Sequence, residues 1–410
     1  MKKIVQFLMI LTLVFACKNT NNEQDYKEIN SKLTADLEKG YQKGAIVGFS
    51  VSIVDSEGVL YENSFGYRDT ELSKKYTPNT LQNIASISKT LIGVSLLKAQ
   101  ELGKLNLEDP INQYLPFDIK NPAYPDAPIL IKHLAYHTSS IVDIDEVYAR
   151  SYVLEGSHHD ESEHVYEWFQ QHETKIELIE FLKNSLTENG KWYVKEMFAN
   201  TKPGEVREYS NIGAALCAQI IQNATGQDYQ SFTKEYILKP LKMNSSGWTS
   251  KDIDASQRSK LFINKETTIA NYSLITYADG GFISSNQDLN LYLIELINGY
   301  HGKGTLLNKE SYQKLFEWKT FPNAEEEGKF GIFMEFTNEF IRVKEQVIGH
   351  NGSDPGVTTA MYYNPETKTG KIMFINTDSD AGKDYWPEVV SIWKSLIAYE
   401  SSIHKERLQE

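Results

Sequence analysis

The chain has 410 residues, of which 40% are hydrophobic and 24% are charged. These proportions are typical of a folded globular protein and exclude a disordered chain or one with many membrane spans. The length predicts two or three packed subdomains. With 42 Lys and Arg against 55 Asp and Glu, the net charge of −13 would repel phosphate backbones, so we expect no nucleic-acid partner.

The N-terminus has the pattern of an export and tethering signal. A basic start precedes an apolar run over residues 4–16, which is too short to span a bilayer comfortably. The run ends at Cys17 and a polar stretch follows, which resembles a bacterial lipobox. The resemblance implies a lipoprotein signal peptide over 1–16, lipidation of Cys17 and a tether over 17–26; the alternative is an ordinary secretory signal with an incidental cysteine. We expect a periplasm-facing or surface lipoprotein of the cell envelope, in contact with the membrane only through this anchor.

Alternating apolar residues predict strands near both ends of the chain. Residues 47–54 and 59–65 form one predicted hairpin, and residues 357–363 and 371–377 form a second. An amphipathic helix is predicted after the second hairpin, with four apolar residues on one face. These residues are Trp386, Val389, Trp393 and Leu396.

The middle of the chain is predicted to be mostly helical, with apolar residues at helical spacing over 84–102, 214–223 and 288–298. Strands at both ends predict an α/β (α+β) fold, in which one antiparallel sheet is built from both termini and flanked by helices. We expect one folded domain over 27–400 and a tail at 401–410. The sheet lobe comprises about 27–80 and 325–400, the helical lobe comprises about 84–320, and a cleft is expected between them.

Ser86 and Lys89 form the first candidate catalytic element, at the start of the helix predicted over 84–102. Serine is a poor nucleophile unless a neighbour accepts its proton, and a lysine three residues on lies on the same helix face. The helix N-terminus also favours negative charge that develops there. The spacing alone is a weak signal, because it recurs in stretches where a solvated helix face explains it. Such repeats include Ser95/Lys98, Ser231/Lys234, Ser311/Lys314 and Ser391/Lys394.

Tyr209 and Asn211 form the second element, in a loop that precedes the helix predicted over 214–223. A residue just before a helix can present its side chain to a cleft, where Tyr moves protons and Asn holds a substrate amide. The alternative is a capped helix start with a packed tyrosine.

The third element is the run His350-Asn351-Gly352-Ser353. A glycine at this point allows a ligand to approach the backbone closely. The alternative is a polar turn with a surface histidine. A literal Lys-Thr-Gly sequence at 368–370 lies in the loop of the second predicted hairpin, and we interpret it as a turn.

The order and context of these motifs resemble those of the serine β-lactamase and penicillin-binding protein superfamily. The similarity is to its class C-like branch, which includes esterases and D-aminopeptidases, and it covers about residues 30–398. Further similar stretches are 102–116, 129–139, Pro203-Gly204, 240–243 and Gly280-Gly281.

The resemblance implies a role for each motif residue. Ser86 would be the acylated nucleophile, and Lys89 and Tyr209 would share the movement of its proton. Asn211 would bind the substrate carbonyl, and the backbone N–H groups of Ser86 and Ser353 would form the oxyanion hole. His350 would stand where many relatives carry a lysine, with Gly352 beside it.

A neutral imidazole at 350 would weaken the hold on a substrate carboxylate, which counts against a dedicated β-lactamase. We therefore expect a serine hydrolase that cleaves an amide or ester in a small-molecule or peptide substrate, such as a D-amino-acid peptide or a small ester. No cofactor is expected, and we expect a monomer. The alternative is a penicillin-binding-type receptor or sensor that is acylated without efficient turnover.

Other histidines are interpreted as structural. His133 and His137 lie in the stretch that the resemblance assigns to the scaffold, so we predict core or capping roles. The histidines and acidic residues of 158–164 have no fixed ligand spacing and predict a solvated loop, so no metal site is expected.

Overall fold

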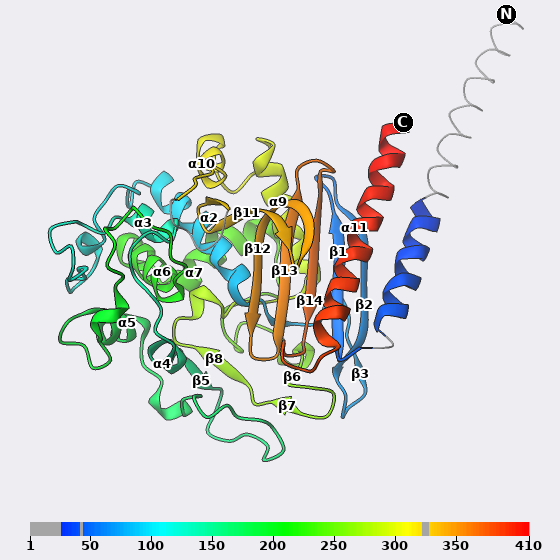
Figure 1. Cartoon of the computed structure of the whole chain (residues 1–410), viewed down its shortest axis with the longest axis horizontal. Coiled ribbons are helices and arrows are strands. Elements are labelled where there is room, and N and C mark those ends of the chain that lie inside the picture. The colour runs from blue at the N-terminus through cyan, green and yellow to red at the C-terminus, as the bar shows by residue number, and fades with distance from the viewer. Residues whose placement is uncertain (1–25, 42–43, 322–327, 410) are drawn as a thin grey trace, which may run out of the picture.

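The computed structural model describes residues 26–41, 44–321 and 328–409 of the chain. The predicted signal peptide and Cys17 lie outside these residues. An antiparallel sheet with two long helices lies on one side of the molecule, and shorter helices with long loops lie on the other (Figure 1). Among the described residues, no helix combines the length and apolar character needed to cross a bilayer.

The main sheet has eight strands in the order β10-β11-β12-β13-β14-β1-β2-β3. The N-terminal strand β1 (Gly48–Val54) lies between β2 (Val59–Asp69) and the C-terminal strand β14 (Thr369–Ile375). This arrangement confirms the predicted sheet built from both termini. The remaining strands are β3 (Lys74–Lys75), β10 (Lys329–Gly331), β11 (Met334–Phe340), β12 (Val343–Asp354) and β13 (Val357–Asn364).

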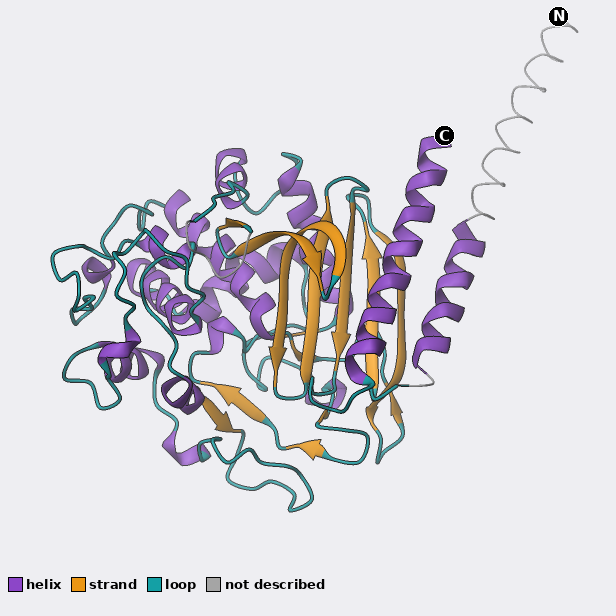
Figure 2. Cartoon of the chain, viewed as in Figure 1, coloured by secondary structure: helices purple, strands orange, loops and turns teal. Residues whose placement is uncertain are grey.

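Helices cover the sheet on both faces, as the complete burial of β1 requires. On one face lie the helix of residues 26–41 and α11 (Tyr385–Gln409), side by side (Figure 2). On the other face α9 (Asn286–Tyr300) packs against β1 and β14. Both predicted hairpins are present, because the turn residues at 55–58 and 365–368 interrupt the apolar alternation.

Helix α11 differs from its prediction in two respects. Trp386 is 45% exposed, whereas Val389, Trp393 and Leu396 are buried, and Tyr385 takes the place of Trp386 at the start of the buried face. The helix also continues through the residues expected to form a tail at 401–410, up to Gln409. Ile403 is buried and Arg407 pairs with Asp55 beside β1, and these contacts hold the last turns in place.

The helical lobe is built around α2 (Ser88–Glu101), which is buried on nearly every side and packs against α6 (Asn211–Thr225). Because α2 lacks a polar face, it occupies the centre of the larger apolar core. The other helices of this lobe are α3 (Ile131–Ala135), α4 (Asp145–Tyr148), α5 (Leu178–Leu186), α7 (Tyr229–Thr233), α8 (Lys239–Leu241) and α10 (Lys309–Leu315). Its short strands are β4 (Gln82–Asn83), β5 (Tyr152–Leu154), β6 (Leu261–Phe262), β7 (Thr268–Ile269), β8 (Tyr272–Leu274) and β9 (Ile283–Ser284).

Candidate active site

Ser86 lies in a short 3₁₀ turn, η1 (Ala85–Ile87), that leads directly into α2. The preceding residue, Ala85, has φ 48°, in the left-handed region that residues with a β-carbon rarely adopt. Both neighbours of Ser86 are buried, whereas Ser86 itself is partly exposed and lines a cavity of about 440 Å³. The turn therefore presents one hydroxyl to an open site, where such local strain is common.

Lys89 lies one helical turn further and is fully buried beneath the cavity. Its Nζ donates to Ser86 Oγ over 3.0 Å, to Asn211 Oδ1 over 2.7 Å and to the Asp279 carbonyl oxygen over 2.8 Å. Three acceptors match the three protons of an ammonium group. The lysine is thereby fixed against the serine hydroxyl, as the motif spacing predicts.

Tyr209 approaches the same pair from the loop before α6. Its ring lies 5.0 Å from Lys89 Nζ and stacks on His137 at a centroid separation of 4.6 Å. Burial raises the pKa of Tyr209, while the charge of Lys89 and hydrogen bonds with Lys89 and Ser86 act to lower it. Burial alone would lower the pKa of Lys89, but Tyr209 and Asp279 reverse this effect and raise it. The net effect is a raised pKa for both groups, so Lys89 is an ammonium group beside a neutral phenol, and its charge favours ionisation of Tyr209 against the effect of burial.

Strand β12 forms the opposite wall. A β-carbon on Gly352 would lie 2.7 Å from the Ser86 nitrogen and 2.8 Å from the Ile84 carbonyl oxygen, so only glycine allows this approach. Thr359 on the adjacent strand donates to the same Ile84 oxygen over 2.8 Å. Ser353 follows Gly352 and lines the cavity with Ser86.

His350 also lies in β12 and is 4% exposed, so the alternative of a surface histidine in a polar turn is wrong. Its ring centroid lies 6.1 Å from that of Tyr209, and its Nδ1 lies 2.5 Å from the Asn351 carbonyl oxygen. The predicted site residues thus converge from three distant segments. Ser86, Tyr209, Asn211, His350, Gly352 and Ser353 line the cavity, with Lys89 directly below.

Several residues of this site escaped the sequence analysis. Asp143 accepts hydrogen bonds from the backbone nitrogens of Asn211 over 2.6 Å and Ile212 over 3.1 Å, and from the Ser210 hydroxyl over 2.8 Å. It therefore caps the start of α6 and positions Asn211. Asp143 lies 68 residues before Asn211 in sequence, and no local pattern relates the two.

Two tyrosines and two further carboxylates were also missed. Tyr148 donates to Asp279 over 2.8 Å, and Tyr152 donates to Asp354 over 2.6 Å. Burial raises the pKa of Asp279 to about 7 and that of Asp354 to about 6. Asp354 had an available signal, since it lies two residues after Gly352 and so on the same face of the strand.

The scaffold histidines contact the backbone. His133 Nδ1 accepts from the Leu130 nitrogen over 3.2 Å, a capping contact, and His137 Nδ1 accepts from the Ser210 nitrogen over 3.1 Å. The stretch 158–164 is largely exposed, and no group of three or more potential metal ligands occurs within the described ranges. The Lys-Thr-Gly sequence at 368–370 lies at the turn between β13 and β14, as interpreted.

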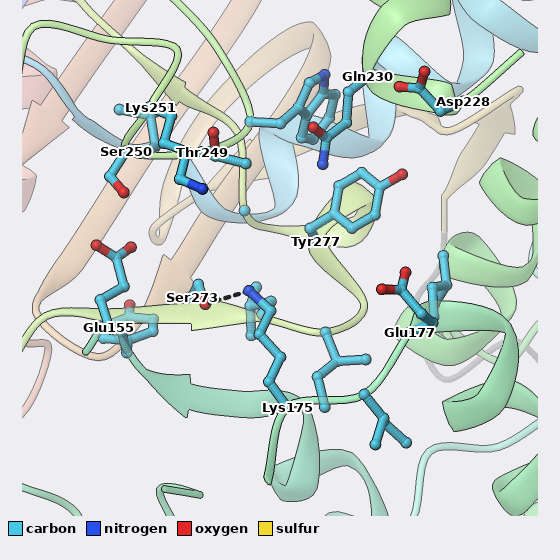
Figure 3. A pocket seen from close by; sticks show the side chains of 18 of the residues that line it. Glu155, Lys175, Glu177, Asp228, Gln230, Thr249, Ser250, Lys251, Ser273 and Tyr277 are labelled. Carbon is cyan, nitrogen blue, oxygen red and sulfur yellow. Dashed lines mark hydrogen bonds between the residues drawn. The ribbon is translucent and has the colours of Figure 1, made fainter. Parts of the chain in front are cut away.

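A larger cavity of about 1020 Å³ is lined by other residues (Figure 3). Side chains such as Glu155, Lys175 and Tyr277 line it, and Lys175 donates to Ser273 over 3.0 Å. Its wall includes the segment 272–283, which also supplies the Asp279 carbonyl to Lys89. The smaller cavity is the candidate active site, because it contains the nucleophile and its polar partners.

Comparison with known proteins places this geometry in a family. The Beta-lactamase family model matches residues 33–390. Protein flp of Staphylococcus aureus (strain MW2) is 25% identical over 376 residues, which cover 90% of this chain and 66% of flp. This chain therefore spans less than two thirds of the length of that relative.

Two solved structures show the same fold. The octameric penicillin-binding protein homologue from Pyrococcus abyssi has a TM-score of 0.65 at 23% identity, with 91% of this chain and 77% of that chain covered. D-amino acid amidase from Ochrobactrum anthropi SV3 has a TM-score of 0.65 at 18% identity, with 92% and 99% covered. The chain belongs to the β-lactamase family, a family of serine hydrolases.

Proposed function

We propose that this protein hydrolyses an amide or ester through a covalent acyl-enzyme on Ser86. The observation that carries the proposal is the 3.0 Å contact between Lys89 Nζ and Ser86 Oγ, at a cavity where Gly352 lets strand β12 approach the Ser86 backbone. A serine that is hydrogen-bonded to a proton-transfer partner and lies beside backbone donors is the arrangement that acyl transfer requires.

The mechanism follows from the charges of the site. The ionised form of Tyr209, which the charge of Lys89 favours against burial, takes the proton of Ser86 while Oγ attacks the substrate carbonyl carbon. The carbonyl oxygen becomes an oxyanion that accepts from the N–H groups of Ser86 and Ser353. Tyr209 then returns the proton to the leaving group. Water releases the acyl group by the same steps in reverse, with Asn211 holding the substrate amide.

Substrates of this proposal are D-amino-acid peptides, their amides and small esters. The name of the D-amino acid amidase from Ochrobactrum anthropi SV3 supports the D-amino acid class. The imidazole of His350, where many relatives carry a lysine, supports substrates that have no carboxylate at this place. We also propose that the enzyme works in the cell envelope, anchored through a lipid on Cys17. The apolar run before Cys17 supports that location.

The test uses purified protein that begins near Asn19, with short-chain p-nitrophenyl esters and a D-alanine peptide as substrates. Ser86→Ala is expected to lose all measurable turnover. Ser391→Ala is the matched control, because Ser391 and Lys394 repeat the same spacing on the exposed side of α11. Turnover that survives in Ser86→Ala would exclude the proposed nucleophile.

Intact-mass measurements separate hydrolysis from the alternative function. We expect an acyl adduct on Ser86 that forms and decays within the time of turnover. An adduct that persists without product release would instead identify a receptor or sensor of the penicillin-binding type.

A further inference from the structure

Among the described residues that line the active-site cavity are two carboxylates, Glu335 and Asp354, and no lysine or arginine. Glu335 accepts from Arg207 over 3.4 Å, and this guanidinium is almost fully buried behind it, so the charge of Glu335 is compensated. Asp354 has no such arginine or lysine in contact within the described chain.

The carboxylate of Asp354 lies close to the nucleophile. Its Oδ1 accepts from Tyr152, and its Oδ2 has no protein donor among the described residues. A β-carbon on Gly280 would lie 3.0 Å from Oδ2 and 3.8 Å from the carbonyl carbon of Ala85, the atom bonded to the Ser86 nitrogen. Gly280 thus leaves space between this oxygen and the turn that carries the nucleophile.

Within the described part of the chain, the cation that acts on Asp354 is shared with other carboxyl groups. The positive charge of Lys89 acts on Asp354 and also on Asp279 and Asp143. All three protons of Lys89 are already directed at other acceptors. Asp354 is therefore a carboxyl group on the cavity wall without a cation of its own among the described residues, and a cationic group of a substrate would stabilise its charge.

We infer that Asp354 binds the protonated amino group of the substrate and so selects substrates with an amine on the acyl side of the scissile bond. The inference rests on the proposed hydrolase function and names its substrate class. These substrates are amides and esters of amino acids, and peptides with a free amino terminus. Tyr152 orients the carboxylate, so that Oδ2 is left for the ammonium group. Substrates with a carboxylate at this place are repelled by Asp354.

The test is a series of three D-alanine p-nitroanilides that differ only in charge at the amino group. The free amine is cationic, the N-acetyl derivative is neutral and the N-succinyl derivative is anionic. For the wild-type protein at pH 7 we expect kcat/KM to fall in that order, with about tenfold or more between the first two. In Asp354→Asn the ratio of the free amine to the N-acetyl substrate should fall to about one.

Two further variants keep the test decisive. Asp354→Glu retains the carboxylate and should retain the preference for the free amine. Asp126→Asn makes the same change of net charge at an exposed position and should leave the ratio as in the wild type. If Asp354→Asn does not fold, the inference is still tested by the order of kcat/KM for the three anilides in the wild type and in Asp354→Glu.

Failure of the inference is distinguishable from failure of the proposed function. If the wild type prefers the N-acetyl or N-succinyl substrate, or if Asp354→Asn keeps the preference for the amine, Asp354 does not select the substrate. If a p-nitrophenyl ester and all three anilides show no turnover that depends on Ser86, the hydrolase proposal itself fails.

Discussion

Gly352 and Ser86 are in backbone contact: a β-carbon on Gly352 would lie 2.7 Å from the Ser86 nitrogen. The contact joins β12 of the sheet to the turn before α2, and so joins the two lobes at the nucleophile. Because the neighbouring atoms belong to the backbone, they cannot move aside without displacing the nucleophile. The position of one glycine therefore sets the geometry of the proposed oxyanion hole.

Gly352→Ala should lower kcat/KM for a p-nitrophenyl ester by about 10²-fold or more, because the strand and the turn must separate. The overpacking should also cost about 1–3 kcal/mol of unfolding free energy. Gly40→Ala is the control, since its β-carbon would meet only Ser391 Oγ at 3.6 Å, an ordinary contact. Equal activity of the two variants would refute the close approach at Gly352.

Lys89→Ala should reduce kcat/KM by about 10²–10⁴-fold, because the ammonium group that favours ionisation of Tyr209 is lost. Lys394→Ala, in the exposed repeat of the same motif on α11, should have no effect on ester hydrolysis. The measurement is initial-rate kinetics between pH 6 and 10. The residual activity of Lys89→Ala should rise towards high pH, where a tyrosine without its ammonium neighbour ionises; a flat profile would argue against Tyr209 as the base.

Asp143→Ala should destabilise the protein by about 1–3 kcal/mol, because the two backbone N–H groups and the Ser210 hydroxyl lose their acceptor. Activity should fall as well, since Asn211 follows directly from this cap. Asp143→Asn retains an oxygen acceptor and should retain more of both properties. Thermal unfolding and ester kinetics on the same samples measure the two effects, and full activity in Asp143→Ala would remove Asp143 from the positioning role.

Asp279 should make the protein less stable as the pH rises. Burial raises its folded-state pKa from the ordinary 3.8 to about 7, so the folded state binds the proton more tightly than the unfolded state. Its contribution to stability therefore falls between about pH 4 and 7 and levels off above, by up to about 4 kcal/mol. Asp279→Asn removes this dependence while it keeps an acceptor for Tyr148.

Unfolding by denaturant at pH 5, 6, 7 and 8 measures this effect. The free energy of unfolding of Asp279→Asn relative to the wild type should increase with pH through that window. A difference that stays constant from pH 5 to 8 would mean that Asp279 does not titrate there.

Cys17→Ser should release the full-length protein from membranes, because the proposed lipid can no longer be attached. Partition into detergent and intact mass of the expressed protein measure this. Cys217→Ala is the matched control, since Cys217 is buried in α6 and should leave partition unchanged. Membrane association that persists in Cys17→Ser would refute the lipid anchor.

Much of the fold was predictable from local pattern. Apolar residues alternate with polar ones at 47–54 and 357–363, and glycines and polar residues follow these runs. Such patterns predict strands and turns directly, because successive side chains of a strand point to opposite faces of the sheet. The end of α11 was not predictable, because Ile403 and Arg407 gain their partners only when the helix lies across the sheet. Ala85 likewise gives no sign in sequence of its left-handed backbone.

The sequence by itself determined that Ser86 and Lys89 are able to act as a pair, since a hydroxyl and an amine three residues apart lie one turn apart in any helix. It did not distinguish this pair physically from Ser391 and Lys394, which have the same spacing. Only the tertiary structure decided that one pair is buried against Asn211 while the other faces solvent. It also brought Asp143, Asp279 and Asp354 around a single ammonium group. The reason is that charge acts through space, and the distances that set its strength arise only when segments remote in sequence pack together.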